Sequence, residues 1–488
     1  MKRSIKISDR KFILLAVDLI IILATTLFGL WIHARGLEML TFNFAYLVDQ
    51  VGWLVLLSSL WLFSAYINGL YDPLKSATLD KTIMLLLRSG TIVMVAYLLV
   101  FFYTAPTILL PRGIVVYQVI SGFVLISIWR ILYIYLAGST RFKRKILIIG
   151  AGWSGKTIAQ AILKYASNQY QIVGFIDDDP SLSGKRIEIP LSEEDYSLDN
   201  LNPVASEYSS IPVLGSAEKL IAIIDKWDIP EVVLAITSDI NTATFRSLMD
   251  CKELAIDISL MSELYENLTG RIPVEHIGDN WFVSLPMDSA ETSIFYSLFS
   301  RLFDIFSVSL GLMVLLPFFP LIALAIYLDF PGPIFYKQER VGKKGKKFNL
   351  YKLRTMIPEA EIGGLARRAI ENDPRVTRVG RWLRKARIDE MPQLFNILRG
   401  DMSAVGPRPE RPFHLIEFDK DVPFHRLRNA VKPGMAGWAV INFGYIDDLE
   451  SARLRLQYDL YYVKHQSIML DLIILIRTFG QVFLMRGR

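Results

Sequence analysis

Two adjacent acidic residues, Asp389 and Glu390, lie in the most basic part of the 488-residue chain. Residues 332–411 contain 19 lysines and arginines against nine acidic residues, an excess of ten positive charges, whereas the whole chain carries a net charge of only +6. Cations can hold a polyanion, and a carboxylate can bind a metal ion or attack phosphorus. These residue types therefore predict phosphate chemistry at the acidic pair.

Two cationic patterns precede the acids. Lys352 and Arg354 lie two residues apart in an expected strand, so they share one face and are spaced to clamp one pyrophosphate. A solvated charged strand edge is the structural alternative. Arginines then recur at every third position and predict a helical stripe that leads to the acids: Arg381, Arg384 and Arg387.

The acids themselves precede an expected helix. Pro392 is tolerated in the first turn of a helix, so Asp389 or Glu390 is expected at or beside its N-terminus, where the helix dipole favours the ionised form. Simple N-capping would explain the same pattern. Arg408 follows between two prolines, whose fixed φ limits the backbone freedom lost when a guanidinium binds phosphate. Three cationic sites around one acidic pair favour a functional explanation over three separate structural ones.

These motifs belong to a membrane protein, because hydrophobic residues make up 52% of the chain and its mean hydropathy is +0.34. Four apolar stretches have the length of a membrane span. Basic residues flank the N-terminus and the second and fourth spans, which predicts that the N-terminus and everything after residue 136 lie in the cytoplasm. The expected spans are Phe12–Ile32, Phe44–Ile67, Ile83–Tyr103 and Ile114–Leu136.

A fifth apolar segment, residues 302–328, is interrupted by Pro317 and Pro320. Its first limb, residues 302–316, would be about 22 Å long as a helix, short of a hydrocarbon core about 30 Å thick. Proline removes a helical donor and bends the chain. The expectation is a re-entrant helix-break-helix that enters and leaves on the cytoplasmic face, with a kinked fifth span as the alternative.

A glycine-rich motif follows the fourth span. An apolar strand, residues 145–149, runs into Gly150, Gly152 and Gly155, and a second strand ends at Asp177, where an acid could meet a ribose hydroxyl. Later apolar runs continue the alternation and predict a Rossmann-like parallel α/β domain. Nucleotide binding stays open, because the glycines would also serve close helix-strand packing. We expect a regulatory or structural role, with nucleotide sensing as the hypothesis.

The expected domains are four transmembrane helices in residues 1–140, the Rossmann-like domain and a linker in 141–292, and an α-rich catalytic domain with the re-entrant helix in 293–488. Cys251 is the only cysteine, which excludes an intrachain disulfide. The five histidines lie far apart in the sequence and provide no zinc-ligand spacing. A histidine-metal enzyme is therefore not expected.

The motifs together resemble the bacterial sugar transferase family, the monotopic polyprenyl-phosphate phosphoglycosyl transferases, over roughly residues 295–488. The four spans and the glycine-rich domain resemble, by architecture, the N-terminal half of the long-form members, which initiate O-antigen, capsule or exopolysaccharide synthesis at the bacterial inner membrane. The motifs that carry the resemblance are Pro331-Gly332-Pro333, Lys352-x-Arg354-Thr355-Met356, Arg387-x-Asp389-Glu390-x-Pro392-Gln393-Leu394-x-Asn396, Gly400-Asp401-Met402-Ser403 and Gly406-Pro407-Arg408-Pro409-Glu410.

The resemblance implies a role for each matching residue. Asp389 would attack the β-phosphate of a UDP-sugar, UMP would leave, and undecaprenyl phosphate would then take the phosphosugar. Glu390 would help to hold Mg²⁺, and the phosphates would be bound by Lys352, Arg354 and Arg408. The resemblance suggests glucose or galactose as the sugar, while N-acetylated and deoxy sugars are not excluded. A large domain on a membrane stalk is compatible with a homodimer.

Two other classes of function compete with this interpretation. The chain could be a membrane-tethered nucleotide-sensing regulator without transferase activity, but the intact Asp389, Glu390 and Arg408 argue against a degenerate site. The basic region could bind nucleic acid or anionic lipid. It lacks the interleaved aromatic residues of a single-strand binding surface, so no nucleic-acid partner is expected.

Overall fold

The computed structural model divides into two compact units, one with the described residues before Tyr265 and one with those from Tyr265 onward. The structure describes residues 7–36, 44–71, 79–103, 112–137, 143–190, 208–237, 240–276, 294–357, 373–443 and 449–483.

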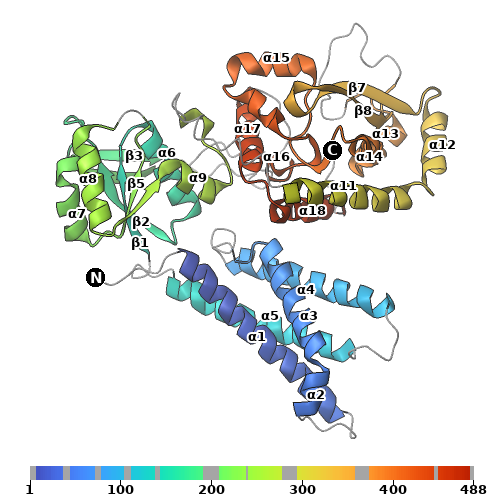
Figure 1. The fold of residues 1–488 in the computed structure, drawn as a ribbon, viewed down its shortest axis with the longest axis horizontal. Coiled ribbons are helices and arrows are strands. Elements are labelled where there is room, and N and C mark those ends of the chain that lie inside the picture. Colours follow the sequence, from blue (N-terminus) through green and yellow to red (C-terminus); the bar gives the residue numbers. More distant parts are fainter. Residues whose placement is uncertain are drawn as a thin grey trace. The chain divides into compact units, whose positions relative to one another are not determined.

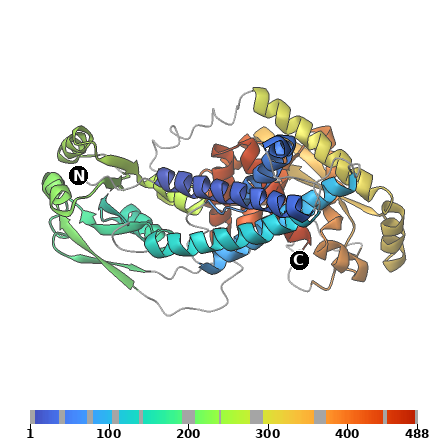
Figure 2. The ribbon, with the colours of Figure 1, turned by 90° about the horizontal axis from the view of Figure 1, so that it is seen from below.

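Long apolar helices form the first part of the first unit. The helices are α1 (Ile7–Gly36), α2 (Phe44–Asp49), α3 (Val51–Ile67), α4 (Leu79–Tyr103) and α5 (Arg112–Ala137). Within α1, α4 and α5, three segments are long and apolar enough to cross a membrane: Lys11–Ile32, Thr82–Leu99 and Val115–Tyr133. The expected helical bundle is present, and α1 and α5 run side by side (Figures 1 and 2).

The second expected span, Phe44–Ile67, is not one continuous helix. The chain breaks at Gln50, whose φ of −95° and ψ of 1° lie outside the helical region. The break leaves α3 with 17 residues, or about 26 Å at about 1.5 Å per residue. Apolar composition predicted the segment, but composition does not report the backbone dihedral of a single residue.

The interior of the bundle also contains polar pairs that the apolar stretches did not predict. Arg130 of α5 donates to Asp18 of α1 over 2.7 Å, and both side chains are buried. Gln118 donates to Thr26 over 2.9 Å, again between α5 and α1. Buried ionisable residues in membrane helices pair with one another, so these contacts set the register of α1 against α5.

A six-stranded sheet forms the rest of the first unit, with the order β3-β4-β2-β1-β5-β6. All pairs are parallel except β3 with β4. Helices α7 (Leu220–Trp227) and α8 (Thr242–Glu253) cover one face, and α6 (Trp153–Tyr165) covers the other (Figure 1). The strands are β1 (Arg144–Ile149), β2 (Tyr170–Ile176), β3 (Arg186–Pro190), β4 (Tyr208–Gly215), β5 (Glu231–Leu234) and β6 (Asp257–Leu260). The expected parallel α/β sheet is confirmed.

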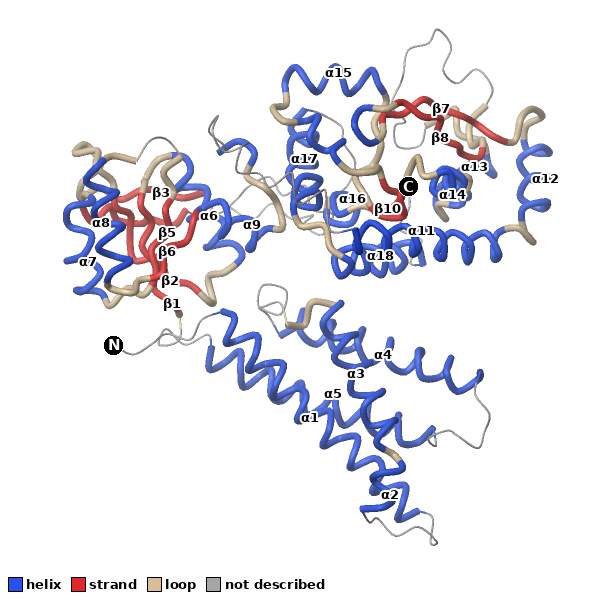
Figure 3. Tube along the Cα trace, in the orientation of Figure 1, coloured by secondary structure: helices blue, strands red, loops and turns tan. Residues whose placement is uncertain are grey.

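The second unit is a mixed domain of helices and two small sheets. β7 and β8 form an antiparallel hairpin, and β9 pairs with β10 in parallel (Figure 3). The unit takes in the end of α9 (Met261–Thr269). The elements that follow are η2 (Val274–His276), α11 (Ile294–Leu315), α12 (Phe319–Asp329), β7 (Phe335–Val341), η4 (Lys343–Gly345), β8 (Lys347–Leu353), α13 (Arg378–Lys385), η5 (Ile388–Glu390), α14 (Gln393–Arg399), β9 (Ser403–Val405), α15 (Pro412–Asp421), η6 (His425–Ala430), β10 (Gly434–Ala436), α16 (Trp438–Asn442), α17 (Leu449–Lys464) and α18 (Ile468–Phe483).

Helices α11 and α12 form the expected helix-break-helix. The break contains Pro317, and Pro320 lies in the first turn of α12, where a missing N–H costs nothing. The two helices run in different directions in both views (Figures 1 and 2). The predicted length of the first limb was wrong, because α11 has 22 residues and contains an apolar segment of spanning length, Phe295–Met313. Length alone therefore does not exclude a spanning α11.

The helical stripe expected to end at Arg387 stops earlier. Helix α13 ends at Lys385, and Arg387 has the left-handed φ of 55° that starts the next turn. Of the three arginines in the predicted stripe, only Arg381 and Arg384 lie on that helix. Helix α18 packs Ile474 into the core beside Tyr462.

Candidate active site

Both acids lie in a single 3₁₀ turn, η5, which the chain enters through the left-handed Arg387. A non-glycine residue in this conformation costs of order 1–3 kcal/mol, so the surrounding structure must hold it. Asp389 and Glu390 are buried. Helix α14 starts at Gln393, and Pro392 stands just before it rather than in its first turn. The acids therefore precede a helix directly, as expected, but do not cap it.

Glu390 binds two of the predicted cations. Its Oε1 accepts from Lys352 Nζ at 3.0 Å and from Arg408 Nη2 at 2.6 Å. Lys352 comes from β8 and Arg408 from the loop after β9, so three segments far apart in sequence meet at one carboxylate oxygen. Charge-assisted hydrogen bonds of this kind fix the geometry of the side chains that make them.

The two acids differ in pKa. Burial alone would raise the pKa of Glu390, but Arg408 and Lys352 outweigh burial and hold it well below its usual range. Burial and the neighbouring Glu390 carboxylate raise the pKa of Asp389, against the opposing charges of Lys352, Arg384 and Arg408. Pairs of acids whose environments separate their pKa values are typical of catalytic sites. Glu390 is therefore the more acidic carboxyl of the pair, and Asp389 is the more basic one.

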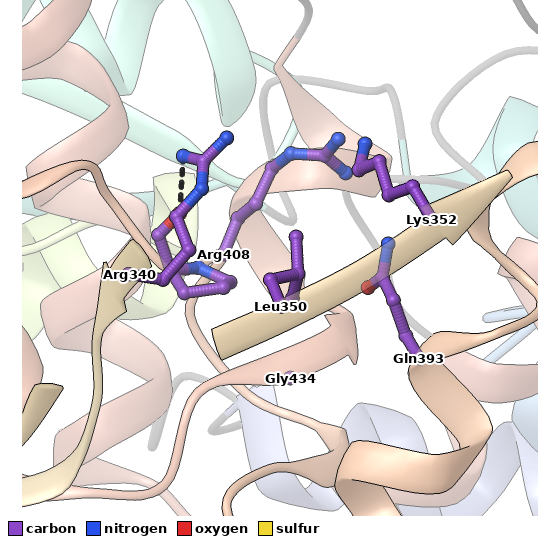
Figure 4. Close-up of a pocket in the computed structure, with 7 residues that line it drawn as sticks. Arg340, Leu350, Lys352, Gln393, Arg408 and Gly434 are labelled. Atoms are coloured by element: carbon purple, nitrogen blue, oxygen red, sulfur yellow. Dashed lines mark hydrogen bonds between the residues drawn. The ribbon is translucent and has the colours of Figure 1, made fainter. Parts of the chain in front are cut away.

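A pocket opens beside this pair. In Figure 4 the head groups of Arg408 and Lys352 point toward one another, and the Gln393 amide points into the same space. Its lining residues are Arg340, Leu350, Lys352, Gln393, Arg408, Pro409 and Gly434. Three cations in one pocket fit a substrate with more than one phosphate charge.

Five of the seven lining residues were not predicted as site residues, among them Gln393, Arg340 and Gly434. Gln393 had a local signal, because it is a buried amide four residues after the acidic pair begins. Arg340 lies in the basic stretch around β7, where nothing in the sequence distinguishes it from its neighbours. Gly434 lines the pocket because β10 pairs with β9, and this pairing is a tertiary contact that the sequence does not show.

Arg354 is not part of this group. Its guanidinium donates to the carbonyls of Ile326, Phe330 and Pro331, at the C-terminal end of α12. A Cβ on Gly332, whose φ is +138°, would stand 2.4 Å from Arg354 Nη1, so glycine makes room for the arginine. The two cations that were expected to clamp one pyrophosphate therefore lie at different places. Lys352 lines the pocket, whereas Arg354 caps the C-terminal end of α12.

Of the three arginines in the predicted helical stripe, Arg384 is the one that influences the pKa of Asp389. It lowers the pKa of Asp389 electrostatically and donates from Nε to Thr355 Oγ1 over 3.0 Å. Arg387 contributes the backbone turn that begins η5.

The donor set fits a Mg²⁺ ion held mainly by substrate phosphates. Both cations on Glu390 bind Oε1, which leaves Oε2 as the oxygen available to a metal ion. No group of three or more His, Cys, Asp or Glu among the described residues could hold a metal by itself. Mg²⁺ commonly uses one or two carboxylates, waters and substrate phosphates rather than a cage made only of protein ligands.

The glycine-rich turn of the α/β sheet has a different arrangement. A Cβ on Gly155 would stand 1.9 Å from the Gly150 carbonyl oxygen, so glycine permits close packing of α6 on the turn, whereas a Cβ on Gly152 would meet nothing within 4 Å. Asp177, the acid expected to meet a ribose, accepts from the backbone N–H groups of Ala151 at 2.7 Å and Asp179 at 2.9 Å. Nucleotide binding by these four residues stays a prediction.

Comparison with known proteins matches both halves of the chain. Residues 295–485 match the family model described as bacterial sugar transferase, and residues 66–262 match a model described as CoA-binding domain. The first match covers α11 to α18, including both acids and the pocket.

Three relatives illustrate the similarity. A protein of Aeromonas hydrophila, UDP-N-acetylgalactosamine-undecaprenyl-phosphate N-acetylgalactosaminephosphotransferase, is 39% identical over 48% of this chain and 54% of its own length. The UDP-glucose:undecaprenyl-phosphate glucose-1-phosphate transferase of Xanthomonas campestris pv. campestris is 31% identical over 56% of this chain and 57% of its own length. The exopolysaccharide production protein PSS of Rhizobium leguminosarum bv. phaseoli is 43% identical over 36% of this chain and 92% of its own length. The chain thus spans a little over half the length of the first two relatives.

Proposed function

The chain belongs to the bacterial sugar transferase family, and on this basis we propose that it transfers a sugar-1-phosphate from a UDP-sugar to undecaprenyl phosphate and releases UMP. The observation that carries the proposal is the buried Asp389 beside Glu390, whose Oε1 bridges Lys352 and Arg408, two residues that line a cationic pocket. This reaction would start the synthesis of a polysaccharide repeat unit.

Two displacements at phosphorus account for the reaction. A carboxylate oxygen of Asp389 attacks the β-phosphorus, and the bond from that phosphorus to the bridging oxygen breaks, so that UMP leaves with the electron pair. A phosphate oxygen of undecaprenyl phosphate then attacks the same phosphorus, and the Asp389 carboxylate is released. One phosphoanhydride replaces another, so the exchange needs no ATP.

Charge neutralisation is the main task of the other residues. An anionic carboxylate that approaches a diphosphate meets like-charge repulsion, which nearby cations must offset. Arg408 and Lys352 stand at the pocket and would hold the donor phosphates there. A Mg²⁺ ion, held by Glu390 Oε2 and the donor phosphates, would neutralise further charge. Glu390 holds both cations through its Oε1.

The placement of α11 supports a half-inserted rather than a spanning helix. In its N-terminal half, one side of the helix is bound to the rest of the second unit: Tyr296 donates to Asp471 over 2.7 Å, Arg301 donates to the carbonyls that end α14 at 2.6 Å, and Asp304 accepts from Ser403 Oγ and Ala404 N at 2.9 Å and 2.8 Å. The opposite side exposes large apolar side chains, of which Phe295 is 84% exposed and Met313 is 75% exposed.

A spanning α11 would carry these polar partners into the bilayer with it. Unsatisfied or charged groups in hydrocarbon cost several kcal/mol each, so the bound side must stay at the membrane surface while the apolar side faces lipid. We therefore propose a re-entrant α11–α12 on the cytoplasmic side of the inner membrane. There the active site would meet the phosphate head of a lipid carrier.

The direct test is UMP release by membranes that contain the protein, with UDP-glucose, UDP-galactose and UDP-N-acetylgalactosamine as donors. The relatives differ in their named sugar, so the panel also identifies the donor. Asp389→Asn should abolish UMP release. Asp419→Asn, which removes an acid that pairs with the exposed Arg426 in the same unit, should retain it.

The covalent intermediate has a separate test. Protein quenched during turnover should contain a phosphosugar adduct on the peptide that carries Asp389, detected by mass spectrometry. Lipid-linked product that accumulates while this peptide stays unmodified would refute the two-step mechanism. UMP release that persists in Asp389→Asn would refute the assigned nucleophile.

A further inference from the structure

The loop that carries Arg408 is held at three consecutive carbonyl groups. The carbonyl of Arg408 accepts from Arg428 Nη2 at 2.9 Å, that of Pro409 from Arg340 Nη1 at 3.0 Å, and that of Glu410 from Val341 N at 3.0 Å. The two prolines that flank Arg408 fix φ on both sides. The backbone of this loop therefore has little freedom left.

Behind the loop lies a buried cluster of two arginines and two acids, Arg428, Arg455, Glu410 and Asp459, which we call the rear cluster. Glu410 Oε1 accepts from Arg428 Nη1 at 3.1 Å and from Arg455 Nη1 at 3.0 Å. Arg428 Nη2 also reaches Asp459 Oδ2 at 2.7 Å. Arg428 is only 4% exposed and Asp459 only 1%. One guanidinium thus joins η6, α17 and the Arg408 loop.

The cluster keeps its charges in spite of burial. Burial alone would raise the pKa of Glu410, but Arg455, Arg428 and Arg340 outweigh burial and hold it well below its usual range. Burial of a charge cluster is expensive, and well-packed apolar residues of similar volume often stabilise a protein as well or better. Global stability alone is therefore a weak reason for a four-charge cluster at this place.

The contacts point to another reason. Arg408 has a long side chain whose rotamer freedom would be lost each time it bound an anion. A backbone fixed at three carbonyls sets the direction in which this side chain leaves the loop, toward Glu390 Oε1 at 2.6 Å and the pocket. A displacement of about 1 Å at such a group can cost on the order of a hundredfold in rate.

We propose that the rear cluster positions Arg408 for the donor diphosphate, and that Arg428 is the positioning residue that acts through it. The inference rests on the proposed function, in which Arg408 binds donor phosphate. Neither Arg428 nor Glu410 lines the pocket. Both act by holding the loop.

A double-mutant cycle on the full-length protein tests this, with the dissociation constant of UDP as the readout. Arg428→Lys keeps the charge but replaces a planar fork that serves three acceptors with a single ammonium group. It should weaken UDP binding by about tenfold, the size expected for a charged hydrogen bond. In an Arg408→Ala background the same change should weaken binding by less than about twofold, because residues that act through one another are not additive.

A merely structural role predicts a different result. Arg428→Lys would then weaken UDP binding equally in both backgrounds, or would leave the dissociation constant unchanged while the melting temperature falls, and either result would overturn the proposal. Wild-type protein that binds UDP but releases no UMP would refute the transferase proposal and leave the cycle to decide the role of Arg428. Wild-type protein that does not bind UDP would overturn both.

A comparison of two acids distinguishes an effect on the position of Arg408 from an effect on the stability of the protein. Glu410 and Glu266 are both buried acids that hold two basic side chains, Arg428 and Arg455 in one case and Lys464 and His465 in the other. Glu410→Gln should weaken UDP binding about tenfold, whereas Glu266→Gln should lower the melting temperature and leave UDP binding unchanged. Equal effects on UDP binding would contradict the proposal.

Discussion

The carboxyl edge of the α/β sheet and the pocket of the second unit each carry an acid in a recognisable motif, but the partners of these acids differ. Both oxygens of Asp177 accept from backbone N–H groups of its own domain. Asp389 instead lies beside Glu390, with Lys352 and Arg408 as its cationic neighbours. The spacing of a motif therefore does not show which partners an acid has. The tertiary contacts of the carboxylate do.

The largest expected effect tests the pocket side of this comparison. Glu390→Gln leaves the partly buried Lys352 and Arg408 without their anion, and we expect UMP release to fall on the order of a hundredfold, with an altered Mg²⁺ dependence. Asp177→Asn should leave UMP release within about twofold and lower only stability. An unchanged Mg²⁺ titration in Glu390→Gln would remove its metal role, and equal losses in both variants would remove the contrast.

The glycine-rich turn provides the second test. Gly155→Ala brings a methyl group against the Gly150 carbonyl and should destabilise the α/β domain by about 3 kcal/mol. Gly152→Ala meets nothing within 4 Å and should cost less than about 1 kcal/mol. Thermal unfolding and limited proteolysis of the full-length protein compare the two. If Gly152→Ala abolished binding of a nucleotide to this domain, the turn would be a ligand site and not only a packing device.

A third acid shows that a raised pKa alone does not mark a reactive group. Burial raises the pKa of Asp471 from 3.8 to about 6, although it accepts hydrogen bonds from Tyr296 and Tyr462. The folded state therefore binds more protons than the unfolded state between these pH values, so this group makes stability fall as pH rises from about 4 to about 6.

Asp471→Asn removes that pH dependence. The variant should gain about 2 kcal/mol of unfolding free energy at pH 7, less than full linkage would predict because the carboxyl is partly exposed. It should retain UMP release. Melting temperatures across pH 4.5 to 7 provide the measurement, and a parallel slope in variant and wild type would contradict the assignment.

The smallest effect concerns the two basic residues of β8. Arg354→Lys should cost about 1 kcal/mol of stability, because a lysine cannot serve all three carbonyls at the end of α12. UMP release should stay within about threefold, since Arg354 does not contact Glu390. Lys352→Met is the matched variant, and we expect it to lose most activity. If Arg354→Lys lost most activity and Lys352→Met retained it, Arg354 rather than Lys352 would be the residue that binds the substrate anion.

Local patterns predicted much of this molecule. Apolar runs of five or six residues predicted β1 and β2 almost to their ends, because a buried parallel strand must be apolar on both faces. The acidic pair and its cations also stood out, since residues 332–411 carry an excess of ten positive charges around the two acids. These features depend on residues close together in the chain.

Other features needed distances between remote segments. A two-residue period put Lys352 and Arg354 on one face but could not show that the end of α12 lies beside only one of them. The conformation of Arg387 ended a helix where the charge pattern continued. The rear cluster joins residues up to 49 positions apart, so no local pattern reports it.

By itself the sequence determined which segments avoid water and where opposite charges are concentrated, because hydrophobicity and charge belong to single residues and their short-range periods. Only the tertiary structure decided which of those charges meet. A carboxylate near a cation in sequence is still solvated and screened, whereas burial at hydrogen-bonding distance makes their interaction strong enough to set a pKa and hold a side chain in place. That difference separates Glu390 and Glu410, whose cations lie at hydrogen-bonding distance away from water, from exposed pairs of the same region such as Glu339 with Lys347.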